Sequence, residues 1–202
     1  KAKTTQGETV FAKGVLEIVP DGYGLLHPTG LISSSEDIYV SQSQITKFDL
    51  RTGDMVAGQV RNPVKPERFF AMLRIEQVNG EAPEKAINRL HFAGLTPVYP
   101  YEKIKLETIA EDLSMRLIDL VAPLGKGQRG LILAPPKAGK TVLLKKIANS
   151  IRQNSPDINL LILLIDERPE EVTDIERSVD AEVISSTFDQ LPENHVKVAE
   201  MV

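Results

Sequence analysis

Residues 134–141 read Ala134-Pro135-Pro136-Lys137-Ala138-Gly139-Lys140-Thr141. They nearly match the phosphate-binding pattern G-x-x-x-x-G-K-[ST], with Ala134 in place of the first glycine. In such a loop, backbone N–H groups surround phosphate oxygens at the start of a helix, whose dipole favours anions. Pro135 and Pro136 have no N–H group, so we expect the donors to begin at Lys137. The stretch predicts a nucleotide site.

The side chains of this loop have expected roles. Gly139 permits close approach of the backbone, Lys140 places a positive charge at the β- and γ-phosphates, and the Thr141 hydroxyl is a ligand for Mg²⁺. Lys137 is either a second cation beside the phosphates or a solvated loop lysine. ATP and Mg²⁺ are the expected cofactors. The expected nucleotide contacts are Lys137, Ala138, Gly139, Lys140, Thr141 and Val142.

Strand-like and helix-like segments alternate around the loop. A short apolar run over 130–133 precedes it, and residues 140–154 repeat apolar side chains at helical spacing after it. Residues 160–165 are unbroken apolar, as in a parallel strand that is covered on both faces. A helix over 170–179 and a strand over 182–185 follow. This alternation predicts an α/β domain with a parallel sheet.

The expected sheet is incomplete. Three parallel strands leave both edges open, and residues 193–202 read as the start of a helix with no stop signal. We therefore expect the sequence to be a fragment of a longer protein.

Two carboxylates follow the apolar strand. Asp166 and Glu167 lie at the carboxyl edge of the expected sheet, where α/β folds bind ligands. In one interpretation Asp166 binds Mg²⁺, and in another Glu167 is the base that orients an attacking water. In a third, the charges only mark the exit of the strand into solvent. The residues alone leave these alternatives open.

The first eighty residues show a different pattern from the rest of the sequence. Five strand-like runs, separated by turn residues, occupy 14–19, 23–26, 37–40, 54–61 and 69–78. This spacing predicts a small five-stranded barrel of the nucleic-acid-binding type. Six of the ten aromatic residues lie here, beside nine basic and nine acidic residues. Because the barrel has no net charge, we expect it to bind unpaired bases by stacking rather than by phosphate attraction.

The composition excludes several classes of protein. The net charge of −4 argues against a protein that acts mainly on duplex DNA. The absence of cysteine excludes disulfides and thiolate metal sites. No apolar run approaches the roughly 18 residues of a membrane span, and the N-terminus has no apolar signal region. We expect a soluble, cytoplasmic protein with no membrane partner.

In both halves, the sequence resembles the Rho family of bacterial transcription termination factors. The first half carries the resemblance in Asp21-Gly22-Tyr23-Gly24-Leu25-Leu26, Asp37-Ile38-Tyr39-Val40-Ser41 and Leu50-Arg51-Thr52-Gly53-Asp54. The second half carries it in residues 120–141 and in Leu164-Ile165-Asp166-Glu167-Arg168-Pro169-Glu170-Glu171-Val172-Thr173. The family's own phosphate loop has the same substituted glycine, so Ala134 supports the match.

The resemblance implies a homohexameric, RNA-dependent ATPase and helicase that moves along nascent transcripts and displaces them from RNA polymerase. It implies catalytic roles for Glu167, Lys140 and Lys137, with Glu167 activating water. Asp166 then merely precedes the catalytic glutamate, and the metal-binding aspartate lies beyond residue 202. The family also needs an arginine from a neighbouring subunit. The 202 residues alone are therefore expected to bind RNA without hydrolysing ATP.

For RNA, the resemblance implies base stacking on Tyr23 and Tyr39. It implies polar contacts from Asp37 and Arg68, whose neighbours Glu67 and Phe69 belong to the same site. Two departures concern residues of the expected site: Leu25 replaces a frequent aromatic residue, and His27 replaces a frequent basic one. A structural alternative is that Tyr23 and Tyr39 simply fill the core of the barrel.

The resulting fold class is β plus α/β. It comprises an N-terminal tail over 1–13, an OB or cold-shock-like barrel over 14–80, a connector over 81–117 and a truncated RecA-like ATPase domain over 118–202. Two other functions stay open. One is a subunit of a rotary ATPase, which also places a small barrel before a phosphate-loop domain. The other is an RNA-binding module whose nucleotide loop is vestigial.

Overall fold

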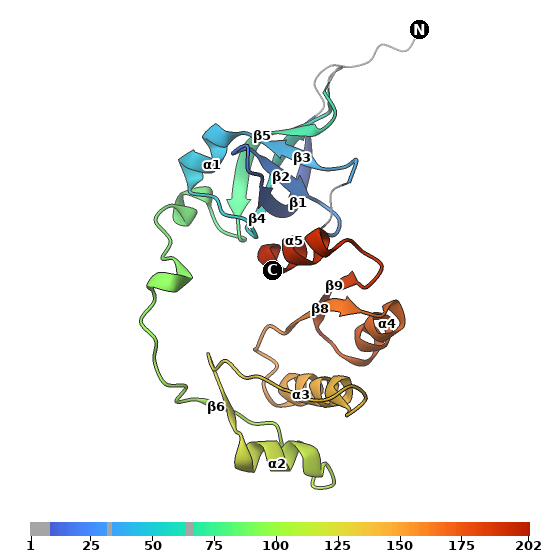
Figure 1. Ribbon diagram of the computed structural model, residues 1–202. Coiled ribbons are helices and arrows are strands. Elements are labelled where there is room, and N and C mark those ends of the chain that lie inside the picture. Colours follow the sequence, from blue (N-terminus) through green and yellow to red (C-terminus); the bar gives the residue numbers. More distant parts are fainter. Residues whose placement is uncertain (1–8, 32–33, 64–66) are drawn as a thin grey trace. The chain divides into compact units, whose positions relative to one another are not determined.

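The chain forms two compact units (Figure 1). The computed structural model describes residues 9–31, 34–63 and 67–202, so the first eight residues of the expected tail lie outside the described residues. The first unit contains the chain up to Leu95 together with Leu191–Val202, and the second unit is Thr96–Gln190.

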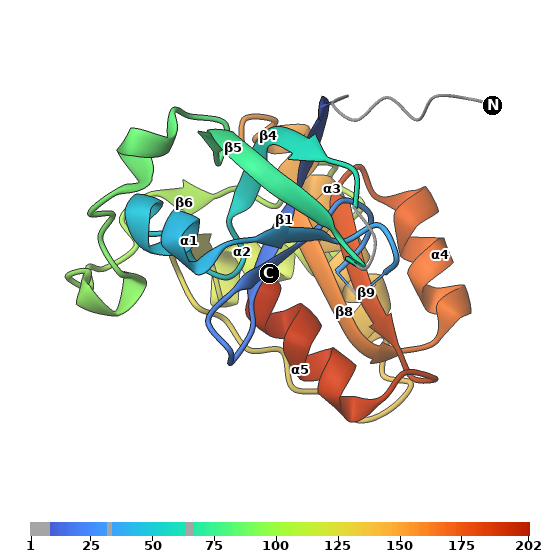
Figure 2. The same cartoon turned by 90° about the horizontal axis from the view of Figure 1, so that it is seen from above.

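The first unit is built on a closed five-stranded barrel. Its strands are β1 (Thr9–Ile18), β2 (Gly24–His27), β3 (Ile38–Val40), β4 (Met55–Arg61) and β5 (Phe70–Val78). The order around the barrel is β1-β2-β3-β5-β4, and all neighbours are antiparallel except β3 and β5. All five predicted runs form strands. β1 starts before the expected boundary at residue 14 because its first half pairs with β4, as seen in Figure 2.

Alternating side chains from all five strands fill the barrel. The buried apolar cluster contains Leu16, Leu26, Ile38, Val40, Leu50, Val56, Val60, Met72, Ile75, Val78 and Ala86. Gly58 lies at a shift in register between β4 and β5. A Cβ atom there would lie 2.0 Å from the carbonyl oxygen of Arg74. Only glycine therefore permits this approach of the two strands.

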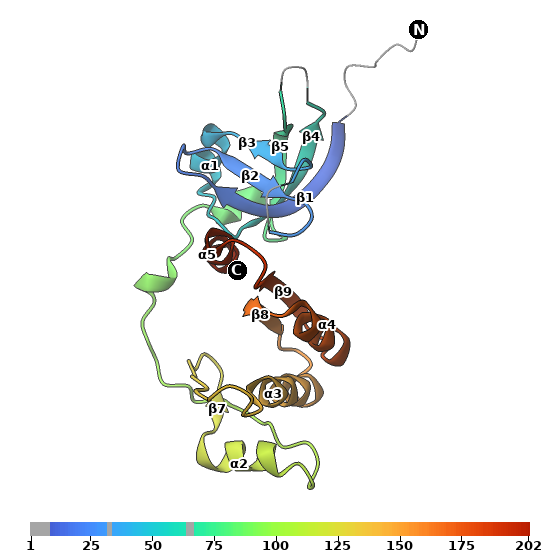
Figure 3. The same ribbon diagram turned by 45° about the vertical axis from the view of Figure 1, so that its right-hand side comes forward.

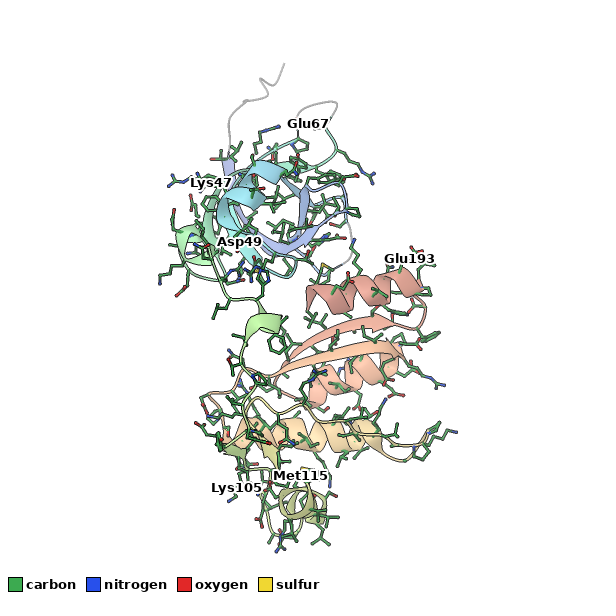
Figure 4. All side chains as sticks on the ribbon, turned by 60° about the vertical axis from the view of Figure 1, so that its left-hand side comes forward. Lys47, Asp49, Glu67, Lys105, Met115 and Glu193 are labelled. Atoms are coloured by element: carbon green, nitrogen blue, oxygen red, sulfur yellow. The ribbon has the colours of Figure 1, made fainter. Side chains whose placement is uncertain are left out.

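A short helix, α1 (Gln42–Phe48), covers part of the barrel and was not predicted from the sequence (Figure 4). Ser41 and Gln44 form a reciprocal capping box at its start, a pattern that marks a helix N-terminus. The Gln44 side chain also donates to the carbonyl oxygen of Met72 at 3.2 Å. This bond fixes α1 to β5.

The first part of the expected connector is anchored to the barrel. Here the chain forms a 3₁₀ turn, η1 (Pro83–Ala86), and a second one, η2 (Phe92–Gly94). Arg89 donates two hydrogen bonds of 2.6 Å to the Asp54 carboxylate. Asn79 donates a third, of 2.9 Å. These bonds explain why the barrel unit extends past residue 80.

The second unit mixes short strands and helices (Figure 3). Its elements are β6 (Lys103–Ile104), α2 (Leu113–Val121), β7 (Leu124–Gly125), α3 (Lys140–Asn154), β8 (Leu161–Glu167), α4 (Pro169–Ser178) and β9 (Glu182–Thr187). β8 and β9 are parallel, and Ala148, Leu164, Val172, Ile175 and Val179 form a buried cluster with them. The last helix, α5 (Pro192–Met201), belongs to the first unit. None of the described helices is long and apolar enough to cross a membrane.

Two expectations for the second unit were wrong. Residues 130–133 do not form a strand, so the described sheet has two parallel strands rather than three. Leu131 is 87% exposed and Leu133 is 91% exposed, because no described strand pairs with them. An apolar run becomes a strand only where a neighbour supplies hydrogen bonds. The helix α2, which lies largely in the expected connector, was missed.

The Asp54–Arg89 pair should stabilise the barrel unit. Burial favours the neutral carboxyl, but hydrogen bonds from Arg89, the Arg51 N–H and Asn79 outweigh it and hold the pKa of Asp54 below its ordinary value. Asp54→Asn is expected to lower the free energy of unfolding by about 2 kcal/mol at pH 7, because Arg89 loses its charged partner. The measurement is urea unfolding followed by circular dichroism.

The dependence on pH provides a second check. Since the folded pKa is depressed, this stabilisation is complete above the unfolded value of about 3.9 and is lost as the pH falls through the folded pKa. The difference between wild type and Asp54→Asn should therefore shrink below pH 4. Lys85→Ala, which breaks an exposed pair with Glu81, is the control and should cost under about 0.5 kcal/mol. Equal losses in the two variants would contradict the prediction.

Candidate nucleotide and nucleic-acid sites

The predicted phosphate loop ends at the start of α3. Gly139 is the N-cap residue, with φ of 89° and no side-chain capping bond. Lys137 also has a positive φ, of 63°. The first-turn N–H groups of α3 therefore have no capping side chain and face the loop, which is the arrangement that binds anions. The left-handed conformation at Gly139 is one that glycine adopts at little cost.

Most of the predicted nucleotide residues line one cavity. The cavity has a volume of about 590 Å³ and is lined by Ala134, Pro135, Pro136, Lys137, Gly139, Lys140, Thr141, Val142, Glu167 and Glu171. Ala138 instead lines an adjoining hollow of about 370 Å³. Val142 lines both, and the apolar side chains of Ile132 and Leu143 contribute to the second. The two hollows share Ala134, Gly139, Lys140 and Val142, so they meet at the loop.

Two carboxylates approach the loop from β8 and α4. The Lys140 Nζ atom lies 3.4 Å from Oε1 of Glu167, and both side chains are partly exposed. The Thr141 hydroxyl lies 3.5 Å from Oε2 of Glu171. Sequence reasoning assigned no role to Glu171. The available signal was its place in the first turn of α4, four residues after Glu167.

Glu167 reaches the cavity because β8 contains a bulge. The register with β9 shifts by one residue between Ile165 and Glu167, so Asp166 has no partner in the ladder. Asp166 adopts a left-handed conformation with φ of 59°. An extra residue reverses the side to which the next side chain points. Glu167 therefore lines the cavity, whereas Asp166 is exposed and does not.

The aromatic residues of the barrel form a pair at β2 and β3. The rings of Tyr23 and Tyr39 lie 5.4 Å apart between centroids, tilted by 35°. Tyr39 is 38% exposed, and neither tyrosine belongs to the buried core. Phe70, in contrast, packs against that core. The structure thus places the two tyrosines at the surface rather than as core filling.

Three residues expected in the RNA site are buried in the barrel. Leu25 lies opposite Tyr39 in the ladder and is 7% exposed, so it supports the tyrosine without offering a stacking surface. Asp37 is fully buried and bonds to Nδ1 of His27 at 3.0 Å. The other ring nitrogen of His27 lies 2.9 Å from Glu17. Burial between partners leaves these polar groups no free surface.

The remaining expected RNA residues lie at the start of β5. Glu67, labelled in Figure 4, accepts two hydrogen bonds from Arg61, of 2.6 and 2.8 Å. These bonds raise the pKa of Arg61. The Arg68 guanidinium lies 5.5 Å from the centroid of the Phe69 ring. Because β5 pairs with β3, this segment lies beside the strand of Tyr39.

Comparison with known proteins identifies both parts. Residues 12–84 match the family model of the Rho termination factor RNA-binding domain, and residues 114–190 match the nucleotide-binding domain of the ATP synthase alpha/beta family. Transcription termination factor Rho of Bacillus subtilis (strain 168) is 59% identical over the whole chain, which covers 48% of that protein. The whole chain is thus similar to transcription termination factors of the Rho family.

Other relatives agree. The Rho factors of Pseudomonas aeruginosa and Escherichia coli (strain K12) are 51% and 50% identical over the whole chain, which covers 49% of each. The chain therefore spans about half the length of the curated relatives that it matches. The predicted family and the predicted fold class are both confirmed. The second family model also explains why the sequence shares features with rotary ATPase subunits.

The bulge at Asp166 generates a prediction about stability. A β-branched residue tolerates the left-handed conformation poorly, whereas glycine and asparagine tolerate it well. Asp166→Val should lower the free energy of unfolding of the second unit by about 1–2 kcal/mol. Asp166→Gly and Asp166→Asn should match or exceed the wild type. Urea unfolding provides the measurement, and equal stability of the valine and glycine variants would show that the bulge does not form.

Proposed function

We propose that the protein containing this chain is an RNA-dependent ATPase and translocase that terminates transcription. One observation carries the proposal: a single chain combines an exposed tyrosine pair on a barrel with a phosphate loop whose Lys140 faces Glu167. The names of its relatives agree with this function. We further propose that it acts in the cytoplasm as a homohexamer on nascent transcripts at RNA polymerase.

The barrel would hold single-stranded RNA by stacking. Tyr23 and Tyr39 present ring surface, and Arg68 above Phe69 adds a cation beside a third ring. Stacking contributes about 1–3 kcal/mol per base and needs bases that are unpaired. Duplex RNA, whose bases are already stacked, is therefore a poor ligand. His27 and Asp37 would act only by holding the strands that carry these rings.

The phosphate loop fits ATP with Mg²⁺. Uncapped N–H groups, Lys137 and Lys140 would hold the phosphate oxygens, and the Thr141 hydroxyl would hold the metal. The described residues contain no cluster of three or more metal-binding side chains, which suits a metal held largely by phosphate and water oxygens. The bound metal would neutralise charge on the phosphates. In the adjoining hollow, the apolar side chains of Ile132, Val142 and Leu143 would suit the base.

Glu167 is suited to orient water and accept its proton. Its carboxylate lies at the cavity wall, and Lys140 is within 3.4 Å of it. A phosphate group at the loop would attract Lys140 away from this partner and leave the carboxylate free for water. An arginine from a neighbouring subunit would supply further stabilisation of charge.

Two substitutions separate binding from hydrolysis. In the complete protein, Lys140→Ala should abolish nucleotide binding and ATPase activity, whereas Glu167→Gln should keep nucleotide affinity and lose at least about 100-fold in turnover. RNA binding should be unchanged in both. Phosphate release and binding of a fluorescent nucleotide are the measurements. RNA binding without any nucleotide binding by the wild type would favour the module with a vestigial loop.

The RNA site is tested by removing one ring. Tyr39→Ala should weaken binding of single-stranded RNA by about 1–3 kcal/mol, with a shallow dependence on salt, since stacking makes little use of phosphate charge. Fluorescence anisotropy with a labelled oligonucleotide measures both. Tyr101→Ala, at an exposed tyrosine of the second unit, is the control. A steep salt dependence with equal effects of the two variants would refute stacking on this pair.

A further inference from the structure

Glu171 lies in the phosphate-loop cavity although it belongs to neither the loop nor the strand before it. It occupies the first turn of α4 and is half-buried. Its Oε2 atom lies 3.5 Å from the hydroxyl oxygen of Thr141, and its side chain lines the same cavity as Lys140 and Glu167. Glu170, its neighbour, is exposed and does not line this cavity. Only one of the two adjacent carboxylates therefore faces the loop.

The chemistry of a hydroxyl ligand explains why the position of Glu171 matters. A threonine hydroxyl has one proton and two lone pairs. When a lone pair binds a metal ion, the proton needs an acceptor on the other side of the oxygen. Lys140 has no lone pair to offer in its charged form, and Glu167 faces Lys140. Among the described residues that line this cavity, Glu171 is the carboxylate placed at Thr141.

We propose that Glu171 is a positioning residue for Mg²⁺, which it holds through the Thr141 hydroxyl. The inference rests on the proposed function, since it concerns the same nucleotide site. Mg²⁺ usually keeps several waters and few protein ligands, so partners that accept bonds from those ligands set its affinity. Removal of such a partner typically costs 10–100-fold in metal affinity. Oxygens 3.5 Å apart are close enough to tighten into this bond when the metal binds.

The test compares two isosteric substitutions on one helical turn. Mg²⁺ is titrated into the complete protein with a fluorescent ADP analogue, and the metal concentration that gives half the increase in nucleotide affinity is measured. Glu171→Gln should raise this concentration about tenfold or more. Without metal it should bind the analogue as well as wild type or more tightly, since a carboxylate that repels phosphate has gone. Glu170→Gln removes the same charge and should behave as wild type.

The outcomes are distinct. An unchanged Mg²⁺ midpoint in Glu171→Gln, or an equal shift in Glu170→Gln, would overturn the inference. Weaker metal-free binding by Glu171→Gln would also overturn it, because that result indicates damage to the loop. Glu171→Asp, shorter by one methylene, should give an intermediate midpoint. In a Thr141→Ala background, Glu171→Gln should add little, since the bonded hydroxyl is already absent. Absence of nucleotide binding by the wild type would instead refute the proposed function.

Discussion

A single extra residue in β8, Asp166, determines which carboxylate faces the phosphate loop. If Asp166 instead paired regularly with β9, the alternation of the strand would turn Glu167 to the other side of the sheet. The left-handed backbone at Asp166 is tolerated because aspartate accepts this conformation better than most residues. The approach of Glu167 to Lys140 depends on this bulge, and α4, which carries Glu171, begins two residues after Glu167. The chemistry of the second unit thus depends on a local irregularity.

In the barrel, several polar groups near the tyrosine pair are engaged by other groups of the barrel. His27 bonds to both Asp37 and Glu17, and Glu67 accepts hydrogen bonds from Arg61. Polar groups used in this way hold the strands in register, and an unpaired buried charge would be costly. The tyrosine rings and the Arg68 guanidinium remain at the surface for a ligand. This distribution agrees with the first eighty residues, which have equal numbers of basic and acidic residues.

The sequence patterns predicted elements whose stability is local. The five barrel strands, α3 and the β8–α4–β9 alternation follow from periodicity. They were predicted close to their observed bounds, except that β1 begins five residues before the predicted start. Features that depend on contacts between residues far apart in the sequence were not predicted. The run over 130–133 needed a neighbouring strand, α1 is held by a bond from Gln44 to β5, and Leu25, His27 and Asp37 are buried by partners from other strands. Periodicity contains no signal for such tertiary contacts, nor for the bulge at Asp166.

Each candidate site is assembled within one unit. The tyrosine pair depends on the pairing of β2 with β3, and the groups around the phosphate loop come from α3, β8 and α4. Neither set of contacts includes a residue of the other unit. Coupling between two sites requires an element that has two states. Each ligand must favour one of those states over the other. If hydrolysis depends on RNA, as proposed, that dependence must therefore arise from elements outside both sites, and the geometry of each site can form without the other's ligand.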